Sequence, residues 1–273
     1  AELAYEVERL TIDLEERSKK EEWRLEANKD PVALKDPFAD GVLTVSDRRI
    51  ALNGPIIRGV ADYVTERIAY WNNVSDDPVF IVIDSCPGGS VMEGYRIVKA
   101  MQASKAPVHG VVKSYAASMC AFITTMAQRS YVYPNAVVLH HQMSLGIWGN
   151  MTQTREQLEL AKEWWRRLGE PAAKKMGLTL DQFVKDMYAH NSDGDWEEFG
   201  DEAVKLKWAT HVVHEIRETG VRRKPDDEKK PNPGMRFFAL EEKVGDKGER
   251  FVSLPRLEPF DLYWIHNPDR YYR

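Results

Sequence analysis

Cysteine is scarce in this sequence, which has only Cys86 and Cys120 among its 273 residues. Two cysteines do not make the disulfide framework of a small secreted domain, so we expect two buried free thiols. Long apolar runs are missing as well, and none approaches the ~18 residues of a membrane span. The formal net charge of −5 argues against nucleic acid or an anionic membrane as the main partner. These absences leave a globular protein of ordinary composition.

The sequence also lacks the patterns that hold metals and phosphates. It has no cluster of His, Cys, Asp and Glu with metal-ligand spacing, and no phosphate-binding loop of the Gly-x-x-x-x-Gly-Lys type. We therefore expect neither a metal nor a cofactor. No signal peptide is visible, so we expect a cytoplasmic protein. Because the numbering starts at Ala1 without a methionine, a segment removed before it is the alternative.

Short apolar strands alternate with amphipathic helices from Val42 onward. The clearest strand is 78–83, whose uninterrupted apolar run is typical of a central parallel strand buried on both faces. Strand, helix, strand and helix in succession predict an α/β fold. The predicted elements are a strand at 49–52, a helix at 57–71, the strand at 78–83, a helix at 92–104 and a strand at 108–112. Segments 131–133 and 136–141 are predicted to form a pair of strands that bond to each other.

The composition divides the chain into three parts. Residues 1–41 are predicted to be an N-terminal extension, made of a charged helix to about residue 29 and a proline-containing linker from 30 to 41. Residues 42–220 carry the α/β pattern. Residues 221–273 are predicted to be a C-terminal extension, in which a linker at 221–235 precedes an aromatic-rich tail. We expect that tail to be docked on a subunit surface.

The candidate for chemistry is Ser118, which follows Ala116 and Ala117 between two apolar runs. A serine at a strand-to-helix corner is a good place for a nucleophile, because its hydroxyl projects beyond the end of the sheet. Taken alone, the stretch favours a small residue packed at a corner over a nucleophile. Two further stretches, Asp84–Gly89 upstream and Leu139–Gln142 downstream, favour the nucleophile.

Together these stretches resemble the proteolytic subunit of the Clp protease, a family of serine peptidases. That family has a Ser-Pro-Gly-Gly turn, an Ala-Ala-Ser-Met-Gly-Ala-Phe nucleophile corner and a Pro-Asn…His-Gln segment. The counterparts here are Cys86–Gly89, Ala116–Phe122 and Pro134–Gln142. The similarity runs from about Ser46 to Glu215. It implies a ClpP/crotonase-like fold of repeated β-α-β units with a protruding handle helix, and the activity of a serine endopeptidase.

The resemblance also implies a catalytic triad. Ser118 corresponds to the nucleophile, and His141 to the base that takes its proton. In the family, an aspartate lies eight residues before the alanine of a Glu-Ala-Val segment. That segment is Glu202-Ala203-Val204 here, which places the orienting acid at Asp195. The family spacing counted forward from Gly177 ends five residues earlier, at His190. An insertion before Asp195 explains the difference, and Asp193 is the alternative acid.

The remaining implied site residues bind the substrate. The oxyanion donors would be the backbone N–H groups of Gly89 and Met119. The peptide would add a strand by backbone hydrogen bonds between one edge at Ser90 and Val91 and a second edge at Ser144, Leu145, Gly146 and Ile147. Two departures from the family lie nearby, because Cys86 and Cys120 replace its serine and glycine. We expect each of these two changes to narrow the substrate pocket or to disturb the oxyanion hole.

The helix predicted at 152–175 resembles the handle helix by which Clp proteolytic subunits pair ring to ring. Its Trp164 and Trp165 are predicted to be exposed, which favours a protein contact. We therefore expect a homo-oligomeric ring assembled through this helix. The substrate implied is a peptide or an unfolded protein. Since the chain has no phosphate loop, ATP-dependent unfolding would need a separate ATPase partner.

Three alternatives stay open at this point. The first is a catalytically silent subunit that keeps the fold for assembly, favoured by Cys86, Cys120 and the uncertain acid. The second is a relative of the signal-peptide peptidases, which use a lysine base, and His141 followed by Gln142 argues against it. The third is an acyl-CoA enzyme of the crotonase type, which shares the broad fold but has no counterpart of Ser118.

Overall fold

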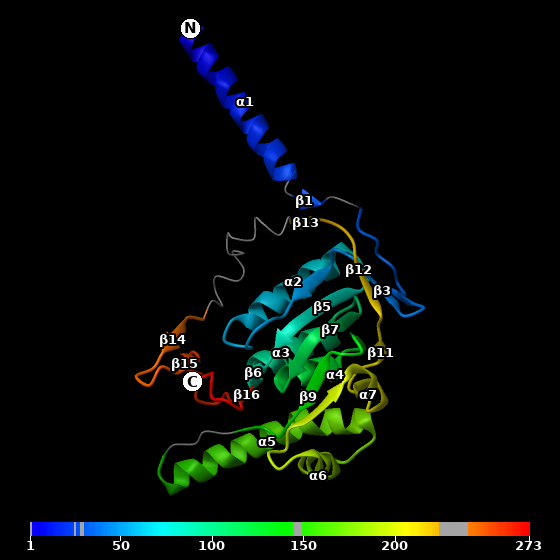
Figure 1. Cartoon of the computed structure of the whole chain (residues 1–273), viewed down its shortest axis with the longest axis vertical. Helices are drawn as coiled ribbons and strands as arrows, with labels where there is room; N and C mark the ends of the chain where they lie inside the picture. The colour runs from blue at the N-terminus through cyan, green and yellow to red at the C-terminus, as the bar shows by residue number, and fades with distance from the viewer. Residues whose placement is uncertain (1, 25, 28–29, 145–148, 224–239) are drawn as a thin grey trace.

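The computed structural model describes residues 2–24, 26–27, 30–144, 149–223 and 240–273 (Figure 1). Its helices are α1 (Glu2–Arg24), α2 (Val60–Val74), α3 (Val91–Ala103), α4 (Met119–Met126), α5 (Met151–Met176), α6 (Leu180–His190) and α7 (Gly200–Lys205). Its strands are β1 (Glu26–Ala27), β2 (Phe38–Ala39), β3 (Val42–Val45), β4 (Arg49–Ala51), β5 (Val79–Cys86), β6 (Gly88–Ser90), β7 (Val108–Ala117), β8 (Arg129–Val132), β9 (Val137–His140), β10 (Trp196–Phe199), β11 (His211–Val212), β12 (Glu215–Glu218), β13 (Arg222–Arg223), β14 (Glu242–Val244), β15 (Arg250–Val252) and β16 (Tyr263–Ile265).

A seven-stranded sheet forms the centre of the molecule, with the main order β10-β9-β7-β5-β4. Strands β4, β5, β7 and β9 run parallel to their neighbours, and β10 closes one edge antiparallel to β9. The helices between these strands make the crossovers that parallel pairing requires. The predicted α/β class is therefore confirmed.

Strand β5 explains how the core is divided. Its side chains alternate in direction, as strand geometry dictates. Val79, Ile81 and Ile83 join the larger core cluster, which also contains buried residues of α2, α3 and α4. Phe80 and Val82 join a second cluster, which packs against the small sheet of β12, β3 and β2. The sheet is thus covered by helices on one face and by a second sheet on the other, as the continuous apolar run predicted.

The strands that follow α4 differ from the prediction. They were expected to pair with each other, but β8 and β9 each pair with β7 instead. Strand β8 pairs with the first half of β7 at His109–Val112, and β9 with the last residues at Tyr115–Ala117. Because β7 is ten residues long, it has room for both neighbours. The end of β7 therefore brings β9 beside Ser118.

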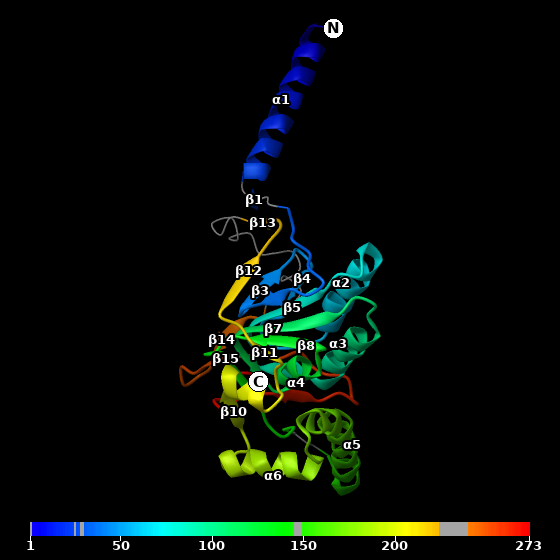
Figure 2. The same cartoon turned by 90° about the vertical axis from the view of Figure 1, so that its right-hand side faces the viewer.

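The N-terminal extension is a projecting helix. Helix α1 points away from the body of the molecule in both views (Figures 1 and 2), and its described side chains from Glu6 to Arg24 are exposed. The predicted linker at 30–41 is not wholly irregular, because β2 within it pairs antiparallel with β3. Of the linker predicted at 221–235, residues 224–235 lie outside the described residues. No described helix is long and apolar enough to cross a membrane.

Helices α5 and α6 lie together at the end of the molecule opposite α1 (Figures 1 and 2). Helix α5 begins with a capping box, in which Asn150 and Gln153 exchange backbone and side-chain hydrogen bonds, and it ends at Gly177 with a positive φ of 84°. Its tryptophans, predicted to be exposed, are half-buried. Trp165 packs 5.5 Å from the ring of Trp264, and Trp164 Nε1 donates to Phe260 O at 3.3 Å. Both contacts come from the C-terminal extension, which sequence periodicity does not locate.

Three buried histidines make the fold sensitive to acid. Burial lowers the pKa of His109 from 6.5 to about 4, and that of both His140 and His141 to about 3. The unfolded chain binds protons near pH 6.5, whereas the folded chain does not until far lower pH. Their stabilising contribution is thus complete above pH 6.5 and is lost as the pH falls toward 3. Each contributes a slope of at most ~1.4 kcal/mol per pH unit.

We therefore expect urea denaturation to show lower stability at pH 5 than at pH 7. In His109→Phe, the difference between the two pH values should shrink by about 2 kcal/mol or less, because one titrating group has been removed. His214, which is exposed, provides the matched control His214→Ala, with the wild-type difference. An unchanged pH difference in His109→Phe would show that His109 is already protonated in the folded protein at pH 5.

Candidate active site

Ser118 stands at a sharp corner between β7 and α4. Its φ of 57° and ψ of −122° are unusual for a residue with a side chain. The corner is held on both sides, since Ser118 N donates to Leu139 O at 2.9 Å and Phe122 N donates to Ser118 O at 3.0 Å. The preceding Ala116 and Ala117 are fully buried. The chain therefore turns where the sequence predicted, and the serine projects from the turn.

His141 follows directly after β9 and meets the serine. Its Nε2 lies 2.6 Å from Ser118 Oγ, within hydrogen-bond distance. His140 faces the other way, as alternation along a strand requires, and its Nε2 lies 3.0 Å from Thr125 Oγ1. Sequence reasoning allowed only one of the two histidines to meet Ser118 and favoured His141. The structure brings that one to the serine.

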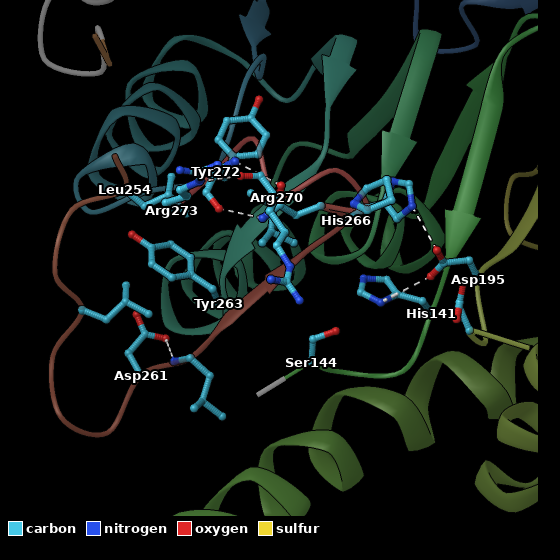
Figure 3. Close-up of a pocket in the computed structure, with 16 residues that line it drawn as sticks. His141, Ser144, Asp195, Leu254, Asp261, Tyr263, His266, Arg270, Tyr272 and Arg273 are labelled. Atoms are coloured by element: carbon cyan, nitrogen blue, oxygen red, sulfur yellow. Dashed lines mark hydrogen bonds and ion pairs between the residues drawn. The ribbon is translucent and has the colours of Figure 1, made fainter. Parts of the chain in front are cut away.

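Asp195 lies next to His141 but is shared with a second histidine. Its Oδ1 is 3.8 Å from His141 Nδ1, which is too long for a hydrogen bond. Its Oδ2 is 3.1 Å from His266 Nε2, and dashed lines join Asp195 to both rings in Figure 3. Asp193, the alternative acid, is exposed in the turn before it, with its N–H donating to Asn191 Oδ1.

His266 is a residue of this site that sequence reasoning missed. Its Nδ1 lies 2.6 Å from the hydroxyl of Tyr115, so it bridges Tyr115 and Asp195. Burial raises the pKa of Tyr115, which keeps that hydroxyl protonated. His266 belongs to the C-terminal extension, which the family resemblance does not cover. No motif around it signals a site.

The glycines before α3 shape the backbone opposite Ser118. A methyl group on Gly89 would collide with the backbone of Ile56, and one on Gly88 would lie 2.7 Å from Ser118 Cβ and 2.8 Å from Met119 N. Both glycines also have positive φ, 93° for Gly88 and 152° for Gly89. Only glycine fits such close approaches. The predicted oxyanion donors, Gly89 N and Met119 N, therefore belong to segments that meet beside the serine.

The two predicted substrate edges differ in what the structure describes. Ser90 and Val91 are both buried, because β16 pairs with β6. Ser144 is exposed and lines a cavity of about 1010 Å³ together with His141, Asp195 and residues of the C-terminal extension (Figure 3). Ser118 is not among the described residues that line this cavity. Leu145, Gly146 and Ile147 lie outside the described residues.

The nucleophile is covered in this arrangement, and the base is nearly so. Ser118 has no exposed surface, and His141 is 5% exposed. Burial, together with the smaller effect of the neighbouring His266, lowers the pKa of His141 to about 3. At neutral pH the imidazole is thus uncharged, which is the state in which it can accept a proton from a hydroxyl.

The two cysteines lie within the core. Cys86 and Cys120 are both free and fully buried, and the pKa of the Cys120 thiol is raised by burial and by its hydrogen bond with Cys86. The expected buried free thiols are thus present. Both belong to the hydrophobic cluster and fill interior volume.

The parallel strands are joined by helical crossovers, and a serine corner follows one strand while a histidine follows its neighbour. These features define a ClpP/crotonase-like α/β protein. A family comparison gives the particular family, because the Clp protease family model matches residues 40–193, more than half of the chain. The chain belongs to the Clp protease family, as the motifs predicted.

Individual relatives are distant. The ATP-dependent Clp protease proteolytic subunit 1 of Streptomyces coelicolor is 29% identical over 144 residues, which cover 52% of this chain and 65% of that protein. Subunit 3 of Streptomyces avermitilis is 28% identical, with coverages of 57% and 74%. Subunit 2 of Tropheryma whipplei is 29% identical, with coverages of 62% and 92%. The match thus spans less than two thirds of the first of these relatives.

Proposed function

We propose that the protein is a serine endopeptidase that hydrolyses peptide bonds with Ser118, His141 and Asp195. The observation that carries the proposal is the 2.6 Å approach of His141 Nε2 to Ser118 Oγ at a strained strand-to-helix corner. A serine hydroxyl needs such a base to attack a carbonyl. Membership of the Clp protease family supports the same reaction.

The proposed reaction follows from the positions of these groups. Ser118 Oγ attacks the carbonyl carbon of the substrate while His141 Nε2 takes its proton, and the N–H groups of Gly89 and Met119 stabilise the resulting oxyanion. His141 then gives the proton to the leaving amine, which leaves an ester on Ser118. A water molecule, deprotonated by His141, hydrolyses the ester and restores the serine. Asp195 holds His141 in the required tautomer and stabilises its charged form.

A fluorophosphonate probe tests this proposal directly, because only an activated serine attacks its phosphorus atom. We expect one covalent adduct per chain, located on Ser118 by peptide mass spectrometry, and none in Ser118→Ala. Asp261 of the C-terminal extension accepts hydrogen bonds from Ser90 Oγ and Met92 N beside the site. If the probe labels neither the wild-type chain nor Asp261→Ala, in which these contacts are removed, the protein is a catalytically silent member of the family.

We further propose a ring-shaped homo-oligomer that uses α5, with a separate ATPase to unfold its substrates. Although its tryptophans are half-buried, α5 still exposes Met151, Leu158 and Leu160, which are 92%, 39% and 38% exposed. Exposed apolar side chains on one helix favour a protein contact. The family and the names of its Clp relatives, which call them ATP-dependent, support both partners.

Light scattering at micromolar concentration should accordingly give a mass that is a multiple of 31.4 kDa. The double variant Leu158→Asp/Leu160→Asp should lower the mass, because charged side chains do not pack in an apolar contact. Glu159→Gln, on the same turn of α5, is the control and should assemble as the wild type does. A monomeric wild-type chain would refute assembly through α5.

A further inference from the structure

The C-terminal extension adds a strand to the substrate edge of the candidate site. Strand β16 pairs antiparallel with β6, so that Tyr263 lies opposite Ser90, Trp264 opposite Gly89 and Ile265 opposite Gly88. Hydrogen bonds continue the pairing on both sides, from Val91 N to Leu262 O at 2.8 Å and from His266 N to Pro87 O at 2.9 Å. Peptide substrates commonly bind as an added strand of this kind.

The register of this strand places a carbonyl group at the nucleophile. A methyl group on Gly88 would lie 2.5 Å from Trp264 O, 2.7 Å from Ser118 Cβ and 2.8 Å from Met119 N. These three atoms therefore surround a single point. Hydrogen-bonding pairs alternate along an antiparallel ladder, and the bonded pairs that flank Trp264 put it in a bonding position opposite Gly89. Trp264 thus directs its carbonyl toward Gly89 N, one of the predicted oxyanion donors, and its oxygen lies near the corner that carries Ser118 and Met119.

The side chain of Trp264 fills a pocket beside this carbonyl. It is 1% exposed, and its Nε1 donates to His141 O at 3.1 Å. The ring lies 6.1 Å from that of Phe122 and 5.5 Å from that of Trp165. An aromatic-lined pocket with one backbone acceptor suits a large aromatic side chain, whose polar atom needs a partner when it is buried.

The residue at the start of the segment is anchored by its charge. Asp261 accepts hydrogen bonds from Ser90 Oγ and from Met92 N through its two carboxylate oxygens. Met92 N belongs to the first turn of α3, where a negative charge is favoured by the helix dipole. The residues before Trp264 therefore follow the edge predicted to bind substrate, and Asp261 fixes their register.

The residue at the other end of the segment engages the predicted triad acid. His266 holds Asp195 Oδ2 at 3.1 Å, while His141 Nδ1 is 3.8 Å from Oδ1. His141 therefore lacks a hydrogen bond to the acid that would orient it. The carbonyl of Trp264 can therefore lie near Ser118 without being attacked, because the base is not oriented for the reaction.

We propose that residues 261–266 occupy the peptide-binding site as an internal substrate mimic, which keeps the site closed, and that the pocket holding Trp264 selects a large aromatic residue on the acyl side of the cleaved bond. The effect on activity rests on the proposed peptidase function, whereas occupancy of the site by residues 261–266 can be measured by binding alone. Release of the segment would free Gly89 and Ser90 for a substrate and Asp195 for His141.

A binding experiment without catalysis tests the occupancy. The probe is a fluorescein-labelled peptide with the sequence of residues 259–267, and all proteins carry Ser118→Ala. We expect the additional change Asp261→Ala to lower the apparent Kd of the probe by ~10-fold or more, since apparent affinity rises with the open fraction. Asp246→Ala is the matched control, an exposed aspartate of the same extension, and should bind as the parent does.

The same assay tests the aromatic pocket. A probe with alanine in place of Trp264 should bind at least ~10-fold more weakly, because it leaves the pocket unfilled, and a probe with phenylalanine there should recover most of the affinity. Equal binding to the parent, the Asp261→Ala chain and the Asp246→Ala chain would overturn the occupancy. Equal binding of the tryptophan and alanine probes would overturn the aromatic selectivity.

A second measurement remains decisive if Asp261→Ala fails to fold. Saturating unlabelled peptide should speed amide hydrogen exchange of residues 262–266 in the Ser118→Ala chain by ~10-fold or more, because the peptide competes with the segment for one site. Unchanged exchange would contradict the proposal. Neither readout needs a reactive serine, so the fluorophosphonate experiment decides the peptidase function separately.

Discussion

Replacing Ser118 by alanine is expected to reduce peptide hydrolysis by ~10⁴-fold or more, the usual cost of losing a triad nucleophile. The change removes a single hydroxyl, which is 2.6 Å from His141 Nε2. The remaining groups can still bind a peptide but have no atom to form the ester. The measurement is the initial rate with a fluorogenic peptide that carries an aromatic residue before the cleaved bond.

The comparison is made in the wild-type chain and again with Asp261→Ala, in which we expect the C-terminal segment to be released and the parent rate to be higher. The matched control is Ser114→Ala, an exposed serine of the same strand β7, which should keep the parent rate. Thermal unfolding of the Ser118→Ala chain should match that of the parent. Activity retained in a folded Ser118→Ala chain would exclude a serine mechanism.

Replacing Asp195 by asparagine is expected to be nearly as costly, with a loss of ~10⁴-fold in turnover. Asparagine keeps the shape of the side chain but favours the wrong tautomer of His141. Asp195 directly precedes β10, which is fixed in register by the pairing of Trp196 with His140. The acid and the base are therefore held by neighbouring strands, and a peptide that displaces His266 leaves the carboxylate to His141.

Asp193→Asn is the matched control for this prediction, because it changes an exposed acid two residues away. Its turnover should remain within a few-fold of the parent, since surface substitutions away from a site have small effects. Both variants are measured in chains that also carry Asp261→Ala, so that the C-terminal segment has the same effect on each. A severe loss in Asp193→Asn would move the acid to Asp193. No loss in either variant would favour a catalytically silent subunit.

Local patterns predicted the elements because they report how a segment is buried. The apolar run of β5 indicated burial on two faces, and the structure has core clusters on both. The same patterns say nothing about partners, which is why β8 and β9 were wrongly expected to pair with each other. Strand pairing depends on contacts between distant residues, and here both strands pair with the long β7.

The juxtaposition of Ser118 and His141 was predictable for a similar reason. Each residue follows a strand of one parallel sheet, and the carboxyl ends of neighbouring parallel strands meet at the same edge. The choice between Asp193 and Asp195 was not predictable in this way, because an insertion shifted the count. The antiparallel register of β10 with β9 puts Asp195, and not the exposed Asp193, within 3.8 Å of His141.

The sequence by itself determined the family, the α/β class and the pairing of a serine corner with a histidine strand end, since these depend on short motifs and on periodic burial. Only the tertiary structure decided what covers the site. The contact between Gly88–Ser90 and Tyr263–Ile265 joins segments far apart in the chain, and neither segment carries a local signal for the other. Their pairing depends on backbone hydrogen bonds, on the fit of Trp264 and on the charge of Asp261, which act only once the domain has folded.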